Sequence, residues 1–374
     1  MLSQLVHSLN THFHLADLIA AKNHSDDFNY TRAGYIARRV RVLTFSFALL
    51  GILWIPVDLA TLSGDYAFSI TIARVVLAGA LLVIGLSSFK LRSLNQNRVL
   101  LGLLLLALGG FYFYAQWVLG EAGRQGFAMG YSFLPFVYIA ALTIFPLSLR
   151  EGFVAGVLVL VWLVLAHLMR GGLMTTPALL DFWLISLLMM IALWAQASYL
   201  NLLLRLYRQA TTDPLTGLFN RAMLMSNMEL AISEAQPDEH FAILMFDLDY
   251  FKRINDTYGH MTGDEVLREF AKLVKAHLRP TDVVGRYGGE EFVALLRDVD
   301  EQQAQKMAER LRQACELHPI KTPGGETLNF TTSIGVTLSG PGNSIQSLLE
   351  KVDDLLYDAK HNGRNRVTFV SMAA

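Results

Sequence analysis

The sequence contains a single cysteine, Cys315, in 374 residues. One thiol cannot form an internal disulfide, and it cannot supply the ligands of a cysteine-based zinc site. Charged residues are also scarce over a long part of the chain: they are sparse between residues 41 and 204 and become common after Arg205. This scarcity excludes an ordinary soluble domain over the first half of the chain and indicates a membrane half followed by a soluble half.

The first forty residues lack the basic start and apolar core of a secretory signal peptide. We therefore expect residues 1–42 to be a cytoplasmic N-terminal segment. Hydrophobic residues make up 53% of the sequence, and a membrane-spanning helix needs about 20 mainly apolar residues. Six stretches qualify, namely 43–62, 68–88, 99–119, 131–149, 152–170 and 178–204. They predict a six-helix transmembrane region over residues 43–204, kinked at Pro56, Pro135 and Pro146.

Lysine and arginine in the short loops set the orientation of such a region. They are frequent before the first span, in the second and fourth loops and after the sixth span, whereas the opposite side has only Arg124 and Arg170. Both termini are therefore expected in the cytoplasm. As a hypothesis, this half of the chain senses a small ligand or a membrane condition.

Several ionisable residues map close to the outer ends of the predicted spans: Asp65, Arg74, Glu121, His167, Arg170 and Asp181. Intramembrane charges are candidates for function, and these could converge on an outward-facing pocket. Anchoring at the membrane interface is the favoured alternative for any one of them.

Residues 205–212 continue the sixth span as a helical linker, and Pro214 ends it because proline disfavours helix at the preceding residue. Residues 213–374 then alternate apolar strands with amphipathic helices. Strands are expected at 241–246, 282–286, 292–296, 328–338 and 366–370, and helices at 263–278, 301–317 and 345–361. This pattern predicts an α+β domain with a mostly antiparallel sheet flanked by helices.

A Gly-Gly turn followed by two acids, Gly288 to Glu291, leads into an apolar strand. Glycine readily adopts positive φ, so the pair predicts a hairpin turn with Glu290 and Glu291 on its return side. Asp247 ends an earlier apolar strand. If the two strands are neighbours, Asp247 and Glu290 would share a hard cation such as magnesium. A solvated turn, and an Asp247–Asp249 cap on the next helix, are the alternatives.

Two further groups suit a nucleotide. Asn255 and Asp264 offer an amide and a carboxylate, which together match the edge of guanine. Lys252, Lys360 and Arg364 offer cations for phosphates. For the last two, a favourable interaction with a helix C-terminus is the alternative.

Together these motifs resemble the GGDEF-domain diguanylate cyclases, in a Gly-Gly-Glu-Glu-Phe form, from about Asp213 to Val370. The resemblance rests on five segments in order: Asp213–Arg221; Phe246–Lys252 with Asn255-Asp256 and Gly259-His260; Gly263-Asp264; Arg286–Phe292; and Lys360 with Gly363-Arg364-Asn365. We recognise no family in the membrane half.

The resemblance implies a bacterial inner-membrane enzyme that condenses two GTP into cyclic di-GMP and two pyrophosphates, with one GTP held by each subunit of a homodimer. Magnesium, or manganese in its place, would be held by Asp247, the Leu248 carbonyl and Glu290, with Glu291 as general base. Asn255 and Asp264 would read guanine. The phosphates would contact Phe251, Lys252, Gly288, Gly289, Lys360 and Arg364. No nucleic-acid partner is expected.

Arg279-Pro280-Thr281-Asp282 resembles the family's Arg-x-x-Asp inhibitory site, which binds the product. Product feedback through Arg279 and Asp282 is thus expected, with Arg310 as a partner from a neighbouring surface. A surface ion pair is the alternative interpretation. At the level of the whole protein, the alternative to an active cyclase is a catalytically silent receptor for cyclic di-GMP, although none of the acids of the glycine–acid hairpin is lost here.

Overall fold

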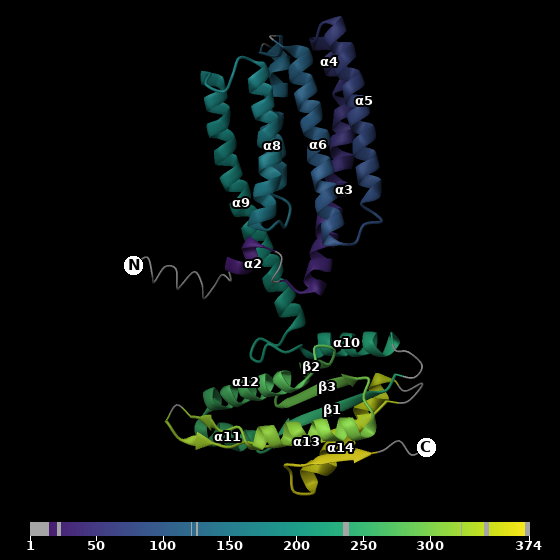
Figure 1. Ribbon diagram of the computed structural model, residues 1–374, viewed down its shortest axis with the longest axis vertical. Coiled ribbons are helices and arrows are strands. Elements are labelled where there is room, and N and C mark those ends of the chain that lie inside the picture. The colour runs from purple at the N-terminus through teal and green to yellow at the C-terminus, as the bar shows by residue number, and fades with distance from the viewer. Residues whose placement is uncertain are drawn as a thin grey trace. The chain divides into compact units, whose positions relative to one another are not determined.

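The computed structural model describes residues 15–20, 24–120, 122–124, 126–234, 239–322, 324–339 and 344–370. The chain divides into two compact units, Met1–Arg205 and Leu206–Ala374, and each is considered by itself (Figure 1). Within the expected N-terminal segment, residues 1–14 and 21–23 lie outside the described residues, as does Glu121. The first long helix begins well before the predicted span, because Ser25 caps it and its Oγ accepts a hydrogen bond from Phe28 N at 3.3 Å.

The first unit is helical. Its elements are α2 (Leu15–Ile19), α3 (Asp26–Leu53), α4 (Ile55–Thr61), α5 (Gly64–Ser87), α6 (Leu94–Leu119), η2 (Ala122–Arg124), η3 (Gly126–Phe133), α7 (Leu134–Leu142), α8 (Leu149–Met169) and the start of α9 (Thr176–Thr211). In the described part of the chain, five helices are long and apolar enough to cross a membrane, with α3 and α4 counted as one. Pro56 separates those two, as expected of a proline inside a helix.

The predicted fourth span, 131–149, differs from the structure. Its place is taken by a shorter apolar segment, Gly126–Leu142, in which 3-10 turns precede Pro135 and a short α-helix follows. The helix ends before Pro146, and α8 starts afresh at a Ser148–Glu151 capping box. Pro146 and the capping box together divide an apolar stretch that, judged by composition alone, was predicted to be one continuous helix.

The second unit carries a five-stranded sheet in the order β2-β3-β1-β6-β7 and a two-stranded ribbon, β4-β5. The strands are β1 (Phe241–Leu248), β2 (Val283–Arg286), β3 (Glu291–Arg297), β4 (Ile320–Lys321), β5 (Thr327–Leu328), β6 (Thr332–Leu338) and β7 (Val367–Val370). The helices are α10 (Arg221–Ser233), α11 (Phe251–Tyr258), α12 (His260–His277), α13 (Glu301–Glu316) and α14 (Ile345–His361). Three pairings are antiparallel and β6-β7 is parallel, so the mostly antiparallel sheet is confirmed.

The central strand β1 is buried along its whole length, and its alternating side chains enter two cores. Leu244 and Phe246 pack with residues of α12 and α13, whereas Ile243 and Met245 pack with residues of α10 and α14. Helices therefore cover both faces of the sheet (Figure 1). This burial fixes the register, because a slip of one residue would exchange the two faces.

Candidate active site

The register of the sheet brings the predicted acids together. β1 pairs with β3 so that Asp247 lies opposite Glu291, and Leu248 N donates to Glu290 O at 3.4 Å. The expectation that the strands bearing Asp247 and Glu290 are neighbours is confirmed.

The glycines of the hairpin turn act differently from the prediction. Neither Gly288 nor Gly289 has a positive φ, so the turn does not need glycine for its backbone conformation. Instead, a Cβ on Gly288 would overlap the Glu291 carboxylate, whereas a Cβ on Gly289 would meet nothing within 4 Å. A side chain at position 288 would thus push aside the flexible end of Glu291, whereas Gly289 leaves open space beside the turn.

A lysine from the last helix completes this group of charges. Lys360 Nζ lies 2.7 Å from Asp247 Oδ2. Burial raises the pKa of Asp247 and outweighs the opposing effect of Lys360, and the nearby charges of Glu291 and Asp249 raise it further. Burial likewise raises the pKa of Glu290, with a contribution from the charge of Asp247. Among the described residues, the site therefore gathers several acids around one nearby cation, Lys360.

Such a pair of carboxylates suits a hard divalent cation, because oxygen ligands and an excess of negative charge are what magnesium selects. Burial raises the pKa of both Asp247 and Glu290, and the charge of Asp247 adds to the rise at Glu290; a bound cation would offset this cost of ionisation. Among the described residues no group of three or more His, Cys, Asp or Glu side chains is arranged to hold a metal. Two carboxylates fit magnesium, which usually keeps water and phosphate oxygens in its other positions.

The residues predicted to read a base are also close to one another. A Cβ on Gly263 would overlap the Asn255 side-chain oxygen and would approach the Phe251 ring at 3.2 Å. Gly263 thereby lets the Asn255 amide lie against the first turn of α12, next to Asp264. Phe251 itself is buried in the core, so only its backbone, at the start of α11, is available to a ligand. Lys252 is exposed.

Arg364 lies on the turn after α14, where Arg364 and Asn365 both have positive φ, 60° and 46°. Its guanidinium stacks over the ring of Tyr250 at 4.6 Å. Lys360 and Arg364 thus flank the segment between β1 and α11, one through Asp247 and the other through Tyr250.

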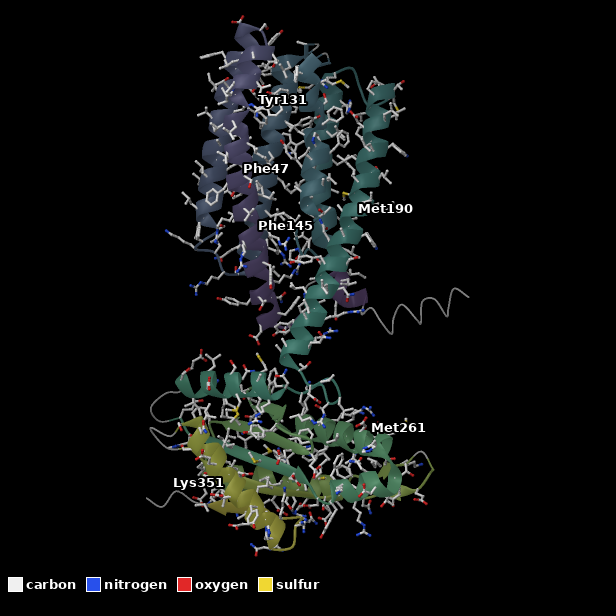
Figure 2. The ribbon with its side chains drawn as sticks, turned by 180° about the vertical axis from the view of Figure 1, so that it is seen from behind. Phe47, Tyr131, Phe145, Met190, Met261 and Lys351 are labelled. Atoms are coloured by element: carbon white, nitrogen blue, oxygen red, sulfur yellow. The ribbon has the colours of Figure 1, made fainter. Side chains whose placement is uncertain are left out.

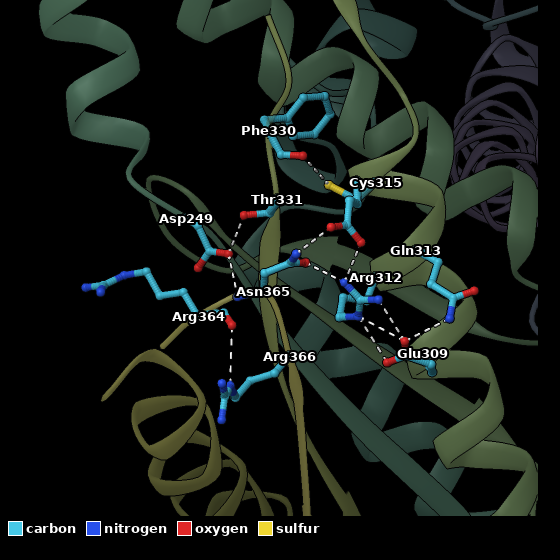
Figure 3. A network of polar contacts seen from close by, with 11 residues as sticks. Asp249, Glu309, Arg312, Gln313, Cys315, Phe330, Thr331, Arg364, Asn365 and Arg366 are labelled. Atoms are coloured by element: carbon cyan, nitrogen blue, oxygen red, sulfur yellow. Dashed lines mark hydrogen bonds and ion pairs between the residues drawn. The ribbon is translucent and has the colours of Figure 1, made fainter. Parts of the chain in front are cut away.

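Asp249 holds this turn in place, a role that sequence reasoning missed. It is buried, and its carboxylate accepts hydrogen bonds from Thr331 Oγ1 at 2.7 Å and from Asn365 N at 3.0 Å (Figure 3). It also accepts one from Ser333 Oγ at 2.7 Å. The interpretation of Asp247–Asp249 as a helix cap is wrong for α11, whose N-cap residue Tyr250 makes no side-chain cap bond. Asp249 instead offsets the strain of the left-handed turn that carries Arg364.

A second positioning contact involves Arg286, just before the turn. Its Nη1 lies 3.2 Å from both carboxylate oxygens of Asp213, while its Nε and Nη2 donate to Gly289 O at 3.1 and 2.5 Å. Asp213 also accepts from Thr216 N and Oγ1. One arginine therefore connects the chain just after α9 to the glycine turn.

The predicted inhibitory residues lie away from these charges, at the start of β2. Asp282 Oδ2 accepts from Arg279 N at 2.8 Å, and its Oδ1 accepts from Arg297 N at 3.2 Å. The Arg279 side chain is exposed. Arg310 Nη2 donates to His277 O at 2.9 Å, two residues before Arg279. Asp282 thus orders the local backbone, and Arg279 is the residue open to a ligand.

Comparison with known proteins identifies this unit. Residues 210–366 match the family described as "Diguanylate cyclase, GGDEF domain". The chain is 41% identical over 169 residues to diguanylate cyclase A of Treponema denticola, covering 44% of this chain and 45% of that protein. It is 42% identical over 161 residues to the response regulator PleD of Caulobacter vibrioides, covering 42% and 36%.

A solved structure is also similar to this chain. The GGDEF domain of DgcB from Caulobacter crescentus, crystallised with c-di-GMP, is 35% identical, with a TM-score of 0.42, and covers 43% of this chain and 95% of that chain. The present chain spans less than half the length of the two curated relatives named above. By the family match and these relatives, residues 210–366 are a GGDEF domain of the diguanylate cyclase family.

Proposed function

We propose that this chain is a membrane-bound diguanylate cyclase that condenses two GTP into cyclic di-GMP and releases two pyrophosphates. The observation that carries the proposal is the pairing of β1 with β3, which gathers Asp247, Glu290 and Glu291 beside the glycine turn with Lys360 against them. Phosphoryl transfer depends mainly on positioning and on neutralising charge, and this arrangement of acids and cations serves both.

Each chain holds one GTP. Asn255 and Asp264 bind the guanine edge, where an amide and a carboxylate match its donors and acceptor. Lys252, Lys360 and Arg364 contact phosphate oxygens, together with the backbone of Phe251 at the start of α11 and of Gly288 and Gly289. Asp247, the Leu248 carbonyl and Glu290 hold a divalent metal ion. When bound, this ion, magnesium with manganese as a substitute, supplies charge neutralisation for the phosphates.

The reaction requires two subunits. The 3′-oxygen of one GTP forms a bond to the α-phosphorus of the other, pyrophosphate leaves, and Glu291 accepts the proton of the hydroxyl. A second, equivalent step closes the ring. Because one subunit supplies only one of the two nucleotides, the active form is a homodimer.

The apolar helices of the first unit support a membrane location for the enzyme. Five of them in the described part of the chain have the length and composition of membrane spans, and the shorter segment Gly126–Leu142 provides the sixth. We place residues 43–204 in the bacterial inner membrane. Residues 1–42, the linker 205–212 and the cyclase domain 213–374 then lie in the cytoplasm, on the side rich in lysine and arginine.

The test is a GTP assay on the full-length protein in lipid nanodiscs with Mg²⁺, with products resolved chromatographically. Cyclic di-GMP and pyrophosphate are expected in a ratio of one to two. Glu291→Gln should abolish product while the protein keeps its melting temperature. Glu265→Gln changes a partly exposed acid on α12 that pairs with Arg268, and it should leave the rate unchanged. Absence of product from the wild type, with binding of cyclic di-GMP retained, would favour the silent receptor.

Product feedback is the finer part of the proposal, and Arg279 carries it because its side chain is exposed at the start of β2. Arg279→Ala should relieve inhibition by added cyclic di-GMP while the initial rate stays that of the wild type. Asp282 is unsuitable for this test, since it also binds two backbone N–H groups. Unchanged inhibition in Arg279→Ala would remove feedback from the proposal and leave the cyclase activity standing.

A further inference from the structure

A closed polar triad lies among the apolar helices of the first unit, outside any role in the cyclase. Asp58 of α4 is 1% exposed. Its Oδ2 accepts from Arg74 Nε of α5 at 2.5 Å, and its Oδ1 accepts from Tyr131 Oη of η3 at 2.6 Å. Arg74 Nη2 in turn donates to Tyr131 Oη at 2.7 Å. Of the ionisable residues predicted near the outer ends of the spans, Arg74 thus pairs with Asp58, and His167 pairs with Asp181 at 3.0 Å.

Arg74 and Tyr131 line a cavity of about 340 Å³ between α3, α5, α6, η3 and α7. Most of its other walls are apolar, including Phe47, Leu77 and Phe111. Figure 2 labels Phe47 and Tyr131, which lie at different heights of the helical bundle. Sites for small molecules are typically cavities of this size, apolar with a few polar groups that fix orientation.

Two glycines keep this cavity open. Gly51 of α3 and Gly130 of η3 both line it, and a Cβ added to either would meet no atom within 4 Å. Neither has a positive φ, so the backbone does not require glycine there. A methyl group added at either position would enter open space at the cavity without meeting its walls. The two glycines therefore leave space in the cavity, and neither is needed for a turn of the backbone.

The hydrogen bonds within the triad indicate which kind of ligand group the cavity can bind. A guanidinium carries five N–H donors, and Arg74 Nη1 makes no hydrogen bond to any residue that the structure describes. The hydroxyl of Tyr131 already donates to Asp58 and accepts from Arg74. What remains toward the cavity is a set of donors, and these need an acceptor.

The charge of the triad decides whether the acceptor group of the ligand is anionic or neutral. The Asp58 carboxylate already balances the positive charge of Arg74. An anionic ligand would leave a net negative charge in apolar surroundings, at a high cost in free energy. A neutral acceptor such as a carbonyl oxygen satisfies the free donors without this cost.

We propose that this cavity is a binding site for a neutral, largely apolar molecule whose carbonyl oxygen accepts a hydrogen bond from Arg74. Its apolar body lies between α3, α6 and α7, with its carbonyl toward the Asp58–Arg74–Tyr131 triad. Two sources share this chemistry: a diffusible ketone-like or quinone-like molecule, and the ester carbonyl of a membrane lipid. The site is distinct from the GTP site and stands whether or not the cyclase proposal holds.

The test uses the full chain in nanodiscs of ether-linked phospholipid, which has no carbonyl. The probe is 2-dodecanone bearing a photoreactive diazirine on its chain, and labelled peptides are mapped by mass spectrometry. Unlabelled 2-dodecanone, dodecane and dodecanoate compete. We expect saturable labelling of peptides containing residues 47–54 and 127–138. Dodecane and dodecanoate should each compete about tenfold less well than the ketone. Dodecane lacks the hydrogen bond to the charged Arg74, and dodecanoate adds a charge.

Gly130→Leu and Gly51→Leu should each remove the saturable labelling. The matched control is Gly79→Leu, because Gly79 of α5 also has no atom within 4 Å of an added Cβ but does not line the cavity. Equal competition by dodecane, better competition by dodecanoate, or labelling that persists in both cavity variants would overturn the proposal. In ester-linked nanodiscs, weaker labelling identifies lipid as the resident ligand, and unchanged labelling identifies a diffusible one.

Discussion

Lys360 Nζ lies 2.7 Å from Asp247 Oδ2, so a lysine expected to bind phosphate contacts a carboxylate expected to bind metal. Burial raises the pKa of Asp247, and the Lys360 ammonium opposes that rise. In the absence of ligands the lysine therefore keeps a buried acid closer to its ionised form. The Asp247 carboxylate is therefore more readily available in its ionised form to a metal cation that binds at the site.

Lys360→Gln should move metal binding to higher pH. Without the ammonium, the pKa of Asp247 rises further, and protons compete with the metal at higher pH than in the wild type. The midpoint of Mn²⁺ binding, measured by electron paramagnetic resonance between about pH 5 and 8, should shift upward by several tenths of a pH unit or more. Lys252→Gln, which removes an exposed lysine of α11, is the matched control and should keep the wild-type midpoint. An unshifted midpoint in Lys360→Gln would contradict this account.

Glu290→Gln should stabilise the metal-free protein at neutral pH while it abolishes cyclase activity. The folded-state pKa of Glu290 is raised, by burial and by the charge of Asp247. The folded protein therefore loses stability as pH rises from the unfolded-state pKa through the folded-state pKa, and the whole loss is present at neutral pH. A neutral glutamine avoids it, and the cyclase domain's melting temperature should rise by about 1–2 °C. The gain should vanish at acidic pH, and a gain that is equal at every pH would exclude this electrostatic cause.

Gly288→Ala and Gly289→Ala should differ even without nucleotide. A Cβ at position 288 overlaps the Glu291 carboxylate, whereas one at position 289 meets nothing within 4 Å. Gly288→Ala should lower the melting temperature of the cyclase domain only slightly, because the flexible end of Glu291 must move, and it should reduce kcat by roughly a hundredfold, since it displaces the proposed base. Gly289→Ala should keep the wild-type melting temperature, so that any loss of activity arises from the bound phosphates. Equal melting temperatures for the two variants would show that the close approach at Gly288 is unimportant.

Much of the soluble half could be predicted because its elements are periodic. The strands, the long helices α12 to α14 and the neighbouring of Asp247 and Glu290 follow from apolar patterns and from acids at strand ends. The helices α10 and α11 and the ribbon β4-β5 were missed. The strand expected over 328–338 is wrong in part, because β5 ends at Leu328 and β6 begins at Thr332. The role of Asp249 was also missed, because its hydrogen bond to Asn365 N spans more than a hundred residues. The glycine turn was predicted with the wrong physical reason, because sequence does not reveal where Glu291 points.

In the membrane half, composition predicts apolar helices but not their polar contacts. Asp58 was absent from the predicted set of ionisable residues, although it is the partner of Arg74. Its place follows from the break at Pro56, which starts a new short helix and turns Asp58 inward. A count of spans is likewise ambiguous where prolines divide an apolar stretch, as between Gly126 and Ser148.

Arg286→Lys should lower cyclase activity by about tenfold or more, although it keeps the positive charge. The guanidinium contacts Asp213 and the Gly289 carbonyl together, and a single ammonium cannot reproduce this fork. Burial opposes ionisation of Asp213, but hydrogen bonds from Thr216 and the charge of Arg286 outweigh it and hold the pKa of Asp213 below its usual value. The stability from this contact is therefore present above the unfolded-state pKa and is lost as pH falls through the folded-state pKa.

The difference in melting temperature between wild type and Arg286→Lys should accordingly shrink on acidification, and kcat should fall with little change in KM for GTP, because Arg286 positions the turn and does not bind the base. Arg297→Lys is the matched control: Arg297 lies on β3 and pairs with Glu239 at 3.1 Å, at the opposite end of that strand from the turn. It should retain activity within about twofold, since a lysine keeps the charge that pairs with Glu239 and the pair lies far along β3 from the acids. If both lysine variants lost activity equally, the effect would belong to the sheet as a whole, and Arg286 would have no special part in linking the chain after α9 to the glycine turn.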